Sequence, residues 1–279
     1  MKFGTSTFPT DYSIPPIELA RALEERGFES LFVTEHTHIP VSRLSPSYIP
    51  GDLPEQYWHV YDPFVALTAA AAVTTNLKVG TSVCLVTEHN PIGLAKQVAS
   101  LDFLSGGRVI FGIGAGWNAE EMADHGVPFK DRWKITRERV LAMREIWTND
   151  EAEYHGEFVD FEPLWSWPKP AQAGGPPVLL GANSKWTYDR IAEYCDGWTA
   201  IDRMTDVADG LEQLRISAEK VGRPMSDFDI TVSTAPEPER VEQLIELGVT
   251  RILFGAPSEP AETVLPLLDE RAKLIEQYS

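Results

Sequence analysis

The chain has 279 residues, of which 43% are hydrophobic and 24% charged, so it is long enough for a large core and has the composition of an ordinary globular protein. Its 42 acidic and 24 basic side chains leave a formal net charge of −18, which argues against nucleic acid and anionic membranes as partners. No apolar run approaches the roughly 18 residues of a membrane span, and the first ten residues lack the apolar core of a signal peptide. We therefore expect a cytoplasmic protein.

Short apolar segments alternate with amphipathic segments along the chain. We predict β-strands at residues 2–8, 30–36, 78–85, 108–114, 177–181, 197–201, 229–233 and 251–254. Residues 15–26 are typical of the intervening helices, because Leu19 and Leu23 fall on one face and Gly27 ends the pattern. About eight such units predict an α/β fold, a parallel sheet closed into a (β/α)8 TIM barrel, and we expect residues 1–279 to form one domain.

A doubly wound open sheet is the alternative fold. Its dinucleotide-binding glycines would follow the first strand, whereas Gly112, Gly114 and Gly116 stand at the end of the fourth, which favours the barrel. These glycines leave the backbone bare on alternate residues. Such a pattern permits the close approach either of a flat ligand or of a neighbouring strand, and the glycines alone leave both interpretations open.

Two segments do not fit the strand and helix repeat. Residues 37–61 follow the second strand, so we expect an ordered loop on the active face that serves as a lid or substrate wall, with a dimer contact as the alternative. Its aromatic residues are Tyr48, Tyr57, Trp58, His59 and Tyr61. Residues 149–176 predict a small hairpin about Gly156, with Trp165 and Trp167 as packing anchors rather than catalytic groups.

A candidate anion site follows the strand predicted at residues 177–181. The sequence Gly181-Ala182-Asn183-Ser184 leads into a helix that we predict to begin at Lys185, and the free amides of a helix start bind anions well. Asn183 or Ser184 would serve as the helix cap. A simple cap without any ligand is the alternative interpretation.

Candidate catalytic and metal-binding residues gather at the end of the second strand. Glu35 and His36 stand where the catalytic residues of barrels stand. His36 and His38 form an HxH pair, but apart from His89 the chain offers no further ligands at matching strand ends, so we predict no metal site. Cys84 and Cys195 lack metal-ligand spacing, and we expect both to be buried thiols.

Several motifs stand in a fixed order between residues 28 and 198. They are FESLFVTEH (28–36), VGTSV (79–83), NPIGLAKQVASLDFLSGGRVIFGIGAGW (90–117), HGVPFKDR (125–132) and PPVLLGANS (176–184), followed by CDGW (195–198). In these motifs the chain resembles the luciferase-like monooxygenase superfamily, and within it the bacterial oxidoreductases that use coenzyme F420.

The resemblance implies a TIM barrel that holds a redox-active ring at the carboxyl ends of its strands, with residues 149–176 inserted before the fifth strand. His36 would lie beside the reactive ring carbon as a proton donor or acceptor, and Glu35 would touch the edge of the ring. A non-prolyl cis peptide bond, by motif match Ser82–Val83, would support the central ring of the cofactor.

The resemblance also implies where the cofactor phosphate binds. The residues that would hold the phosphate are Gly181, Ala182, Asn183 and Ser184, and those along its path are Gly114, Ala115, Gly116, Trp117 and Lys185. Relatives that oxidise a sugar phosphate have a carboxylate where this chain has Trp117. A sugar phosphate is therefore not the expected substrate.

The implied function is hydride transfer between F420 and a small organic substrate. One alternative is an FMN-dependent monooxygenase of the two-component type, and another is a flavin-binding protein without turnover. F420 carries a polyanionic tail that FMN lacks, and Lys185, Lys130 and Arg132 are the basic groups expected to receive it. The resemblance further implies a homodimer in which the helices of residues 63–74 and 91–104 meet across a two-fold axis.

Overall fold

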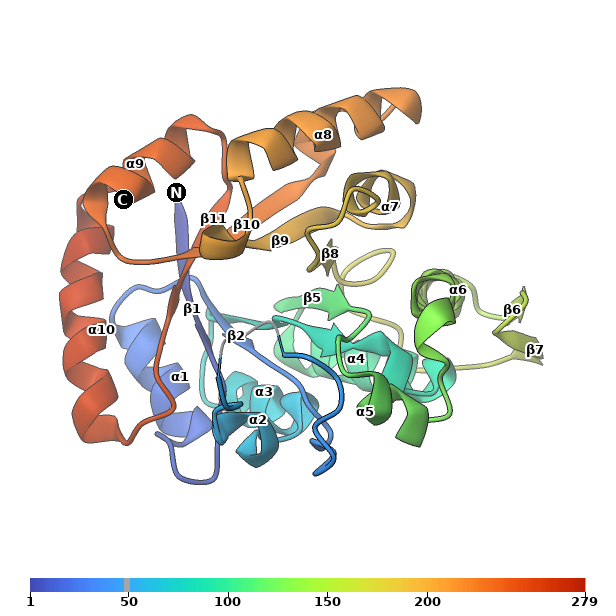
Figure 1. The fold of residues 1–279 in the computed structure, drawn as a ribbon, viewed down its shortest axis with the longest axis horizontal. Coiled ribbons are helices and arrows are strands. Elements are labelled where there is room, and N and C mark those ends of the chain that lie inside the picture. Colours follow the sequence, from blue (N-terminus) through green and yellow to red (C-terminus); the bar gives the residue numbers. More distant parts are fainter. Residues whose placement is uncertain (48–50, 279) are drawn as a thin grey trace.

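The structure is a computed structural model that describes residues 1–47 and 51–278. Eight parallel barrel strands close into the predicted TIM barrel, because β3 pairs with both β2 and β5 (Figure 1). The strands are β1 (Lys2–Thr7), β2 (Ser30–Val33), β3 (Lys78–Thr81) continued by β4 (Cys84–Leu85), β5 (Val109–Gly114), β8 (Val178–Leu180), β9 (Gly197–Ile201), β10 (Asp229–Thr234) and β11 (Arg251–Gly255). The alternative of an open sheet is therefore wrong.

Helices surround the barrel (Figure 1). The longer ones are α1 (Pro16–Glu25), α3 (Pro63–Ala72), α4 (Pro91–Ser105), α6 (Arg132–Thr148), α7 (Thr187–Tyr194), α8 (Val207–Lys220), α9 (Pro238–Glu246) and α10 (Ala261–Glu276). Local sequence explains α4 well, because the Asn90 side chain accepts hydrogen bonds from the first amides and Gly106, at φ 70°, ends the helix. No helix of the described residues is long and apolar enough to cross a membrane.

The barrel interior is closed at the amino-terminal ends of the strands. Side chains from four strands, Phe32, Ile110, Leu179 and Leu253, form a buried cluster separate from the main core between strands and helices. Arg251, at the start of β11, lies 2.9 Å from both Glu29 and Asp229 and is almost fully buried. Arg251 and its two acids therefore fill the amino-terminal end of the barrel, opposite the end where barrel active sites lie.

Two predicted strands are shorter or less regular than expected. β2 ends at Val33, so Glu35 and His36 lie in the loop beyond it rather than on the strand. The strand predicted at residues 78–85 is interrupted between β3 and β4 by a cis peptide bond at Ser82–Val83, which confirms the expected cis bond.

The described part of the loop after β2 contacts a neighbouring helix. It contains a short helix, α2 (Gln56–His59), that the sequence did not predict, and Tyr48 lies outside the described residues. The backbone amides of Leu44 and Ser45 donate hydrogen bonds of 2.7 and 3.0 Å to the Glu120 carboxylate on α5 (Ala119–Asp124). The loop is therefore held against α5.

The insertion before the fifth barrel strand forms the predicted hairpin, β6 (Ala152–His155) paired with β7 (Asp160–Leu164). The amide of Gly156 donates a 2.8 Å hydrogen bond to the Val159 carbonyl at the turn. The prediction that Trp165 and Trp167 anchor the packing is wrong, because these side chains are 78% and 57% exposed. The hairpin projects from the side of the barrel beside α6 (Figure 1).

Candidate active site

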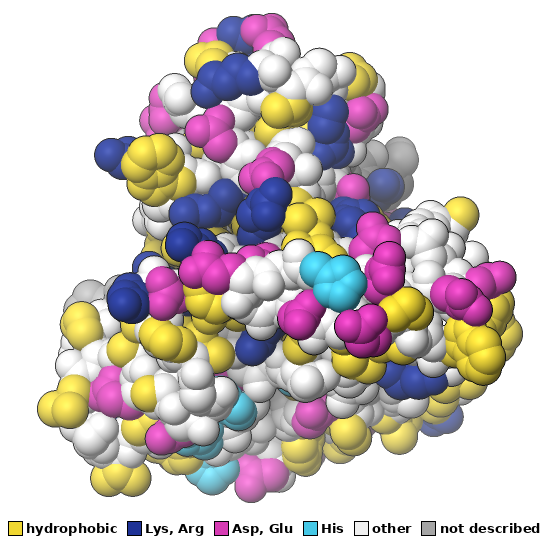
Figure 2. All heavy atoms as spheres, turned by 90° about the vertical axis from the view of Figure 1, so that its right-hand side faces the viewer, with side chains coloured by type: hydrophobic (Ala, Val, Ile, Leu, Met, Phe, Trp, Pro, Cys, Tyr) yellow, Lys and Arg dark blue, Asp and Glu magenta, His cyan; other side chains and the backbone are white. Residues whose placement is uncertain are grey.

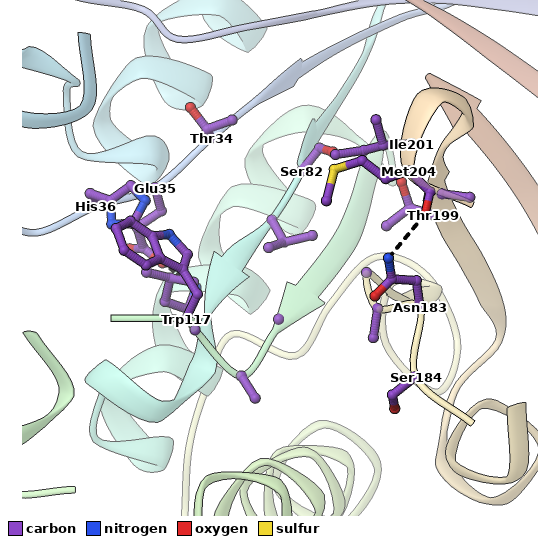
Figure 3. A pocket seen from close by; sticks show the side chains of 18 of the residues that line it. Thr34, Glu35, His36, Ser82, Trp117, Asn183, Ser184, Thr199, Ile201 and Met204 are labelled. Carbon is purple, nitrogen blue, oxygen red and sulfur yellow. Dashed lines mark hydrogen bonds between the residues drawn. The ribbon is translucent and has the colours of Figure 1, made fainter. Parts of the chain in front are cut away.

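A cavity of about 440 Å³ lies at the carboxyl ends of the barrel strands. All twelve predicted site residues line it: Glu35, His36, Ser82, Val83, Gly114, Ala115, Gly116, Trp117, Gly181, Ala182, Asn183 and Ser184. Further lining residues are Phe8, Thr34, Tyr57, Leu85, Arg132, Trp133, Thr199, Ala200, Ile201, Met204 and Thr205. Figure 3 shows Glu35, His36 and Trp117 on one side, and Asn183, Thr199, Ile201 and Met204 on the other.

The cis bond places Val83 between two glycines. A Cβ at Gly114 would lie 2.6 Å from one Val83 methyl group, and a Cβ at Gly181 would lie 2.6 Å from the other. Gly112 has a different role, because its Cβ would lie 2.0 Å from the Thr81 carbonyl oxygen of the neighbouring strand. Gly112 therefore serves strand packing, whereas Gly114 and Gly181 give Val83 its place in the cavity wall.

His36 is held in one orientation by an acid that the sequence analysis missed. Its Nδ1 lies 2.8 Å from Oε2 and 3.1 Å from Oε1 of Glu121, and the two side chains are 6% and 1% exposed. Because a carboxylate only accepts hydrogen bonds, Nδ1–H is the donor, which leaves Nε2 as the base in the neutral ring. The rings of Tyr57 and Trp117 lie 5.3 and 5.9 Å away.

Glu35 supports the end of the broken strand. Its carboxylate accepts a 2.5 Å hydrogen bond from the Leu85 amide and lies 2.7 Å from Nε2 of His89. Burial acts to raise the pKa of Glu35, but the His89 hydrogen bond and charge together with the Leu85 amide lower it overall. The same pairing raises the pKa of His89 against the effect of burial. Glu35 is thus an ionised, fully engaged group at the cavity wall.

The two histidines of the HxH pair lie against different acids. His38 lies 2.9 Å from Asp124 and His36 binds Glu121, so the two histidines have separate partners. Among the described residues, one group with metal-ligand geometry exists, Glu35 with Cys84 and His89. Burial raises the pKa of the Cys84 thiol well above its usual value, so that group offers a neutral thiol rather than a thiolate.

The predicted cap of the helix after β8 is wrong. Helix α7 begins at Thr187, and the Ser184 amide donates a 2.9 Å hydrogen bond to the Thr187 hydroxyl instead of Ser184 capping the helix. Asn183 turns away from the helix, and its side-chain amide donates a 3.2 Å hydrogen bond to the Met204 carbonyl (Figure 3). The backbone of Gly181 and Ala182 nevertheless lines the cavity.

Positive charge stands beside this end of the cavity despite the acidic composition. Arg132 lines the cavity, and burial and its neighbour Arg190 lower the pKa of Arg132. Neither guanidinium forms an ion pair within residues 1–47 and 51–278, and Nη1 of Arg190 is buried without a hydrogen-bond partner there. Lys130 and Lys185 do not line the cavity. Figure 2 shows Lys and Arg side chains gathered across the middle of the face that carries α6 and β6–β7.

A closed (β/α)8 barrel with a cavity, a buried histidine and a carboxylate at the carboxyl ends of its strands has the layout of a barrel enzyme. The family model for luciferase-like monooxygenases matches residues 15–270. The chain belongs to the luciferase-like monooxygenase family.

Two relatives illustrate how the chain stands within the family. An uncharacterized protein of Mycobacterium tuberculosis is 40% identical over 275 residues, which cover 98% of both chains. The F420-dependent glucose-6-phosphate dehydrogenase of Amycolatopsis mediterranei is 30% identical over 231 residues, which cover 77% of this chain and 62% of that protein.

Three solved structures share the fold. A monooxygenase of Streptomyces bottropensis superposes with a TM-score of 0.82 at 21% identity over the whole of both chains. An F420-dependent secondary alcohol dehydrogenase with an F420–acetone adduct has a TM-score of 0.77 at 17% identity, covering 98% of both chains. The oxygenating constituent of 3,6-diketocamphane monooxygenase from Pseudomonas putida, with FMN, has a TM-score of 0.65 at 21% identity, covering 88% of this chain and 71% of that one.

Proposed function

We propose that this chain is an F420-dependent oxidoreductase that transfers a hydride between the deazaflavin and a small organic substrate. The proposal depends on one observation. A single cavity is lined both by Ser82 and Val83, where β3 and β4 are interrupted, and by His36, which Glu121 holds in place. The 30% identity to an F420-dependent dehydrogenase supports F420 as the cofactor.

The residues of the cavity fit such a cofactor. Gly114 and Gly181 leave room for the two methyl groups of Val83, so Val83 stands in the cavity wall where it would support a planar ring. Arg132 lines the cavity and supplies positive charge for a phosphate or an anionic tail. Ser82 and Val83 would support the ring. The phosphate and its path would be held by Gly114, Ala115, Gly116, Trp117, Gly181, Ala182, Asn183 and Ser184.

When bound, the deazaflavin supplies a ring carbon that accepts or gives up a hydride. The protein handles the accompanying proton. Nδ1–H of His36 donates to Glu121, which fixes the ring and leaves Nε2 to exchange a proton with the substrate oxygen. Trp117 occupies the position where a sugar-phosphate oxidising relative would have a carboxylate. We therefore propose a small substrate without a phosphate group.

A second candidate is an FMN-dependent monooxygenase. The monooxygenase of Streptomyces bottropensis has the highest TM-score of the three structures described above, which favours this candidate at the level of the fold. Glu35 and His36 are compatible with either chemistry. The cofactor separates the two candidates, because FMN lacks the polyanionic tail that Arg132 would receive.

Replacing His36 tests the catalytic half of the proposal. His36→Ala should lower turnover of F420 with a panel of small alcohols and aldehydes about 10²- to 10⁴-fold, the usual contribution of a general acid or base, while F420 affinity stays nearly unchanged. His155→Ala is the matched control, because His155 is exposed on the hairpin and pairs only with acids there. An equal loss of affinity and rate would make His36 a positioning residue instead.

We further propose that the protein is a cytoplasmic homodimer. Helices α3 and α4 pack against each other and expose apolar side chains, with Val65 69%, Phe103 58% and Leu104 75% exposed. A self-complementary apolar patch of this kind is the commonest route to a two-fold dimer.

A further inference from the structure

Glu121, the acid that holds His36, faces a second buried acid. Glu88, at the end of the short helix η1 (Val86–Glu88), is 8% exposed and lies within hydrogen-bonding reach of Glu121. Oε1 of Glu88 is fully buried, and no donor group of the described residues forms a hydrogen bond to it. Two carboxylates cannot hydrogen-bond to each other, so a bond between them requires one proton. The buried Oε1 of Glu88, beside the buried carboxylate of Glu121, therefore indicates that one of the two acids is protonated.

The charges around Glu88 decide which acid holds the proton. Glu121 has His36 as its partner at 2.8 Å, and Glu35 has His89 at 2.7 Å. Within the described residues Glu88 has no such close partner, because Nε2 of His125 lies 3.8 Å from Oε2 of Glu88. Burial and the charges of Glu121 and Glu35 raise the pKa of Glu88 to about 9. Glu88 is therefore the neutral member of the pair near pH 7.

Glu88 also faces a second cavity. Its Oε2 accepts a 3.3 Å hydrogen bond from the Thr37 hydroxyl, which in turn lies 2.8 Å from Nε2 of His125. A second cavity of about 360 Å³ is lined by Glu88 together with His89, His125 and Arg139, and the active-site cavity is not lined by Glu88. Burial and the neighbouring His38 lower the pKa of His125, so that imidazole is neutral near pH 7. Glu88 can thus exchange its proton with water on the side away from the substrate.

We propose that Glu88 is a positioning residue that acts on His36 through Glu121, donating a hydrogen bond from its own carboxylic acid to the Glu121 carboxylate. The inference rests on the proposed role of His36. With Glu88 protonated, the pair carries one negative charge, enough to hold Nδ1–H of His36 and leave Nε2 as the base. With Glu88 ionised, the hydrogen bond from Glu88 to Glu121 is lost and two negative charges lie behind Nδ1–H of His36.

The proposal is tested on the ligand-free protein, so that its outcome does not depend on which cofactor binds. Infrared difference spectra between wild type and Glu88→Gln at pH 7 should contain the carbonyl stretch of one protonated carboxyl group, lost in the variant. In histidine-¹⁵N-labelled protein, the Nδ1 resonance of His36, assigned with His36→Gln, should shift in a step near pH 9 in wild type and stay flat in Glu88→Gln.

A second variant guards against a folding defect in Glu88→Gln. Thr37→Val, at an exposed position, removes the hydrogen bond that favours the ionised form of Glu88, so the step should move to higher pH. Absence of the carboxyl band in wild type, its survival in Glu88→Gln, or a wild-type His36 resonance without a step would each overturn the proposal. Failure of F420 to bind would overturn the proposed function and leave these results untouched.

Discussion

The buried acid pair makes protein stability depend on pH in a way that one substitution removes. In the folded chain the pKa of Glu88 is raised from 4.5 to about 9, whereas the unfolded chain releases this proton near the ordinary value. Between these limits the folded state binds one proton more than the unfolded state. The resulting contribution to stability is fully present below pH 4.5 and is lost as the pH rises towards 9.

The size of the effect follows from linkage. One extra bound proton changes the free energy of unfolding by about 1.4 kcal/mol per pH unit, so wild type should lose about 2.7 kcal/mol relative to Glu88→Gln between pH 6 and pH 8. The glutamine keeps the size of the side chain and its hydrogen-bond donor but carries no titratable proton, so the difference between the two proteins isolates Glu88.

Urea unfolding of both proteins at equal concentration, at half-unit steps from pH 5 to pH 8.5, measures this difference. Glu121→Gln is the informative control, because burial then raises the pKa of Glu88 without the charge of Glu121, and the decline in stability should end at a lower pH. If the free energies of unfolding of wild type and Glu88→Gln differ by an amount that stays constant within about 0.5 kcal/mol across this pH range, Glu88 does not bind the extra proton.

Three other predictions concern the cavity, the dimer and the domain. Gly114→Ala should destabilise the protein by about 1–3 kcal/mol and weaken F420 binding, because the new Cβ would lie 2.6 Å from Val83. Gly255→Ala is the control, because Gly255 stands at a strand end with open space around it. In the same urea and titration experiments it should change neither stability nor F420 affinity. Light scattering should give twice the 31.1 kDa chain mass, and Leu104→Glu should reduce it; a monomeric wild type would refute the dimer. Limited proteolysis should find no pair of stable halves divided near Asn149.

The barrel and the position of its cavity were predictable from the sequence because they depend on repeating local patterns. Alternation of strands and helices predicted the fold, and the ends of the predicted strands predicted where Glu35 and His36 would stand. The end of β2 at Val33 was not predicted. Glu35 and His36 nevertheless line the cavity, because the loop that follows a barrel strand begins at the face that carries the cavity.

The contacts between segments that are far apart in the sequence could not be predicted, because no local pattern encodes them. Glu121 lies 85 residues after His36, and Glu88 precedes it by 33 residues in a different element, so neither acid had a signal beyond its residue type. The helix cap at Ser184 was mispredicted because the hydroxyl of Thr187 competes for its amide and the helix begins later. Trp165 and Trp167 were mispredicted because residue hydrophobicity does not reveal which segments the core covers.

Fluorescence titration of the purified protein with F420 and with FMN, at several salt concentrations, tests the central claim most directly. Both cofactors have a flat ring and a phosphate, but only F420 has a polyanionic tail, which Arg132 in the cavity wall would receive. We expect F420 to bind more tightly than FMN and its affinity to fall with added salt, because screening weakens charge interactions beyond about 8 Å at physiological ionic strength. FMN binding at least as tightly as F420 at every salt concentration would contradict the deazaflavin assignment.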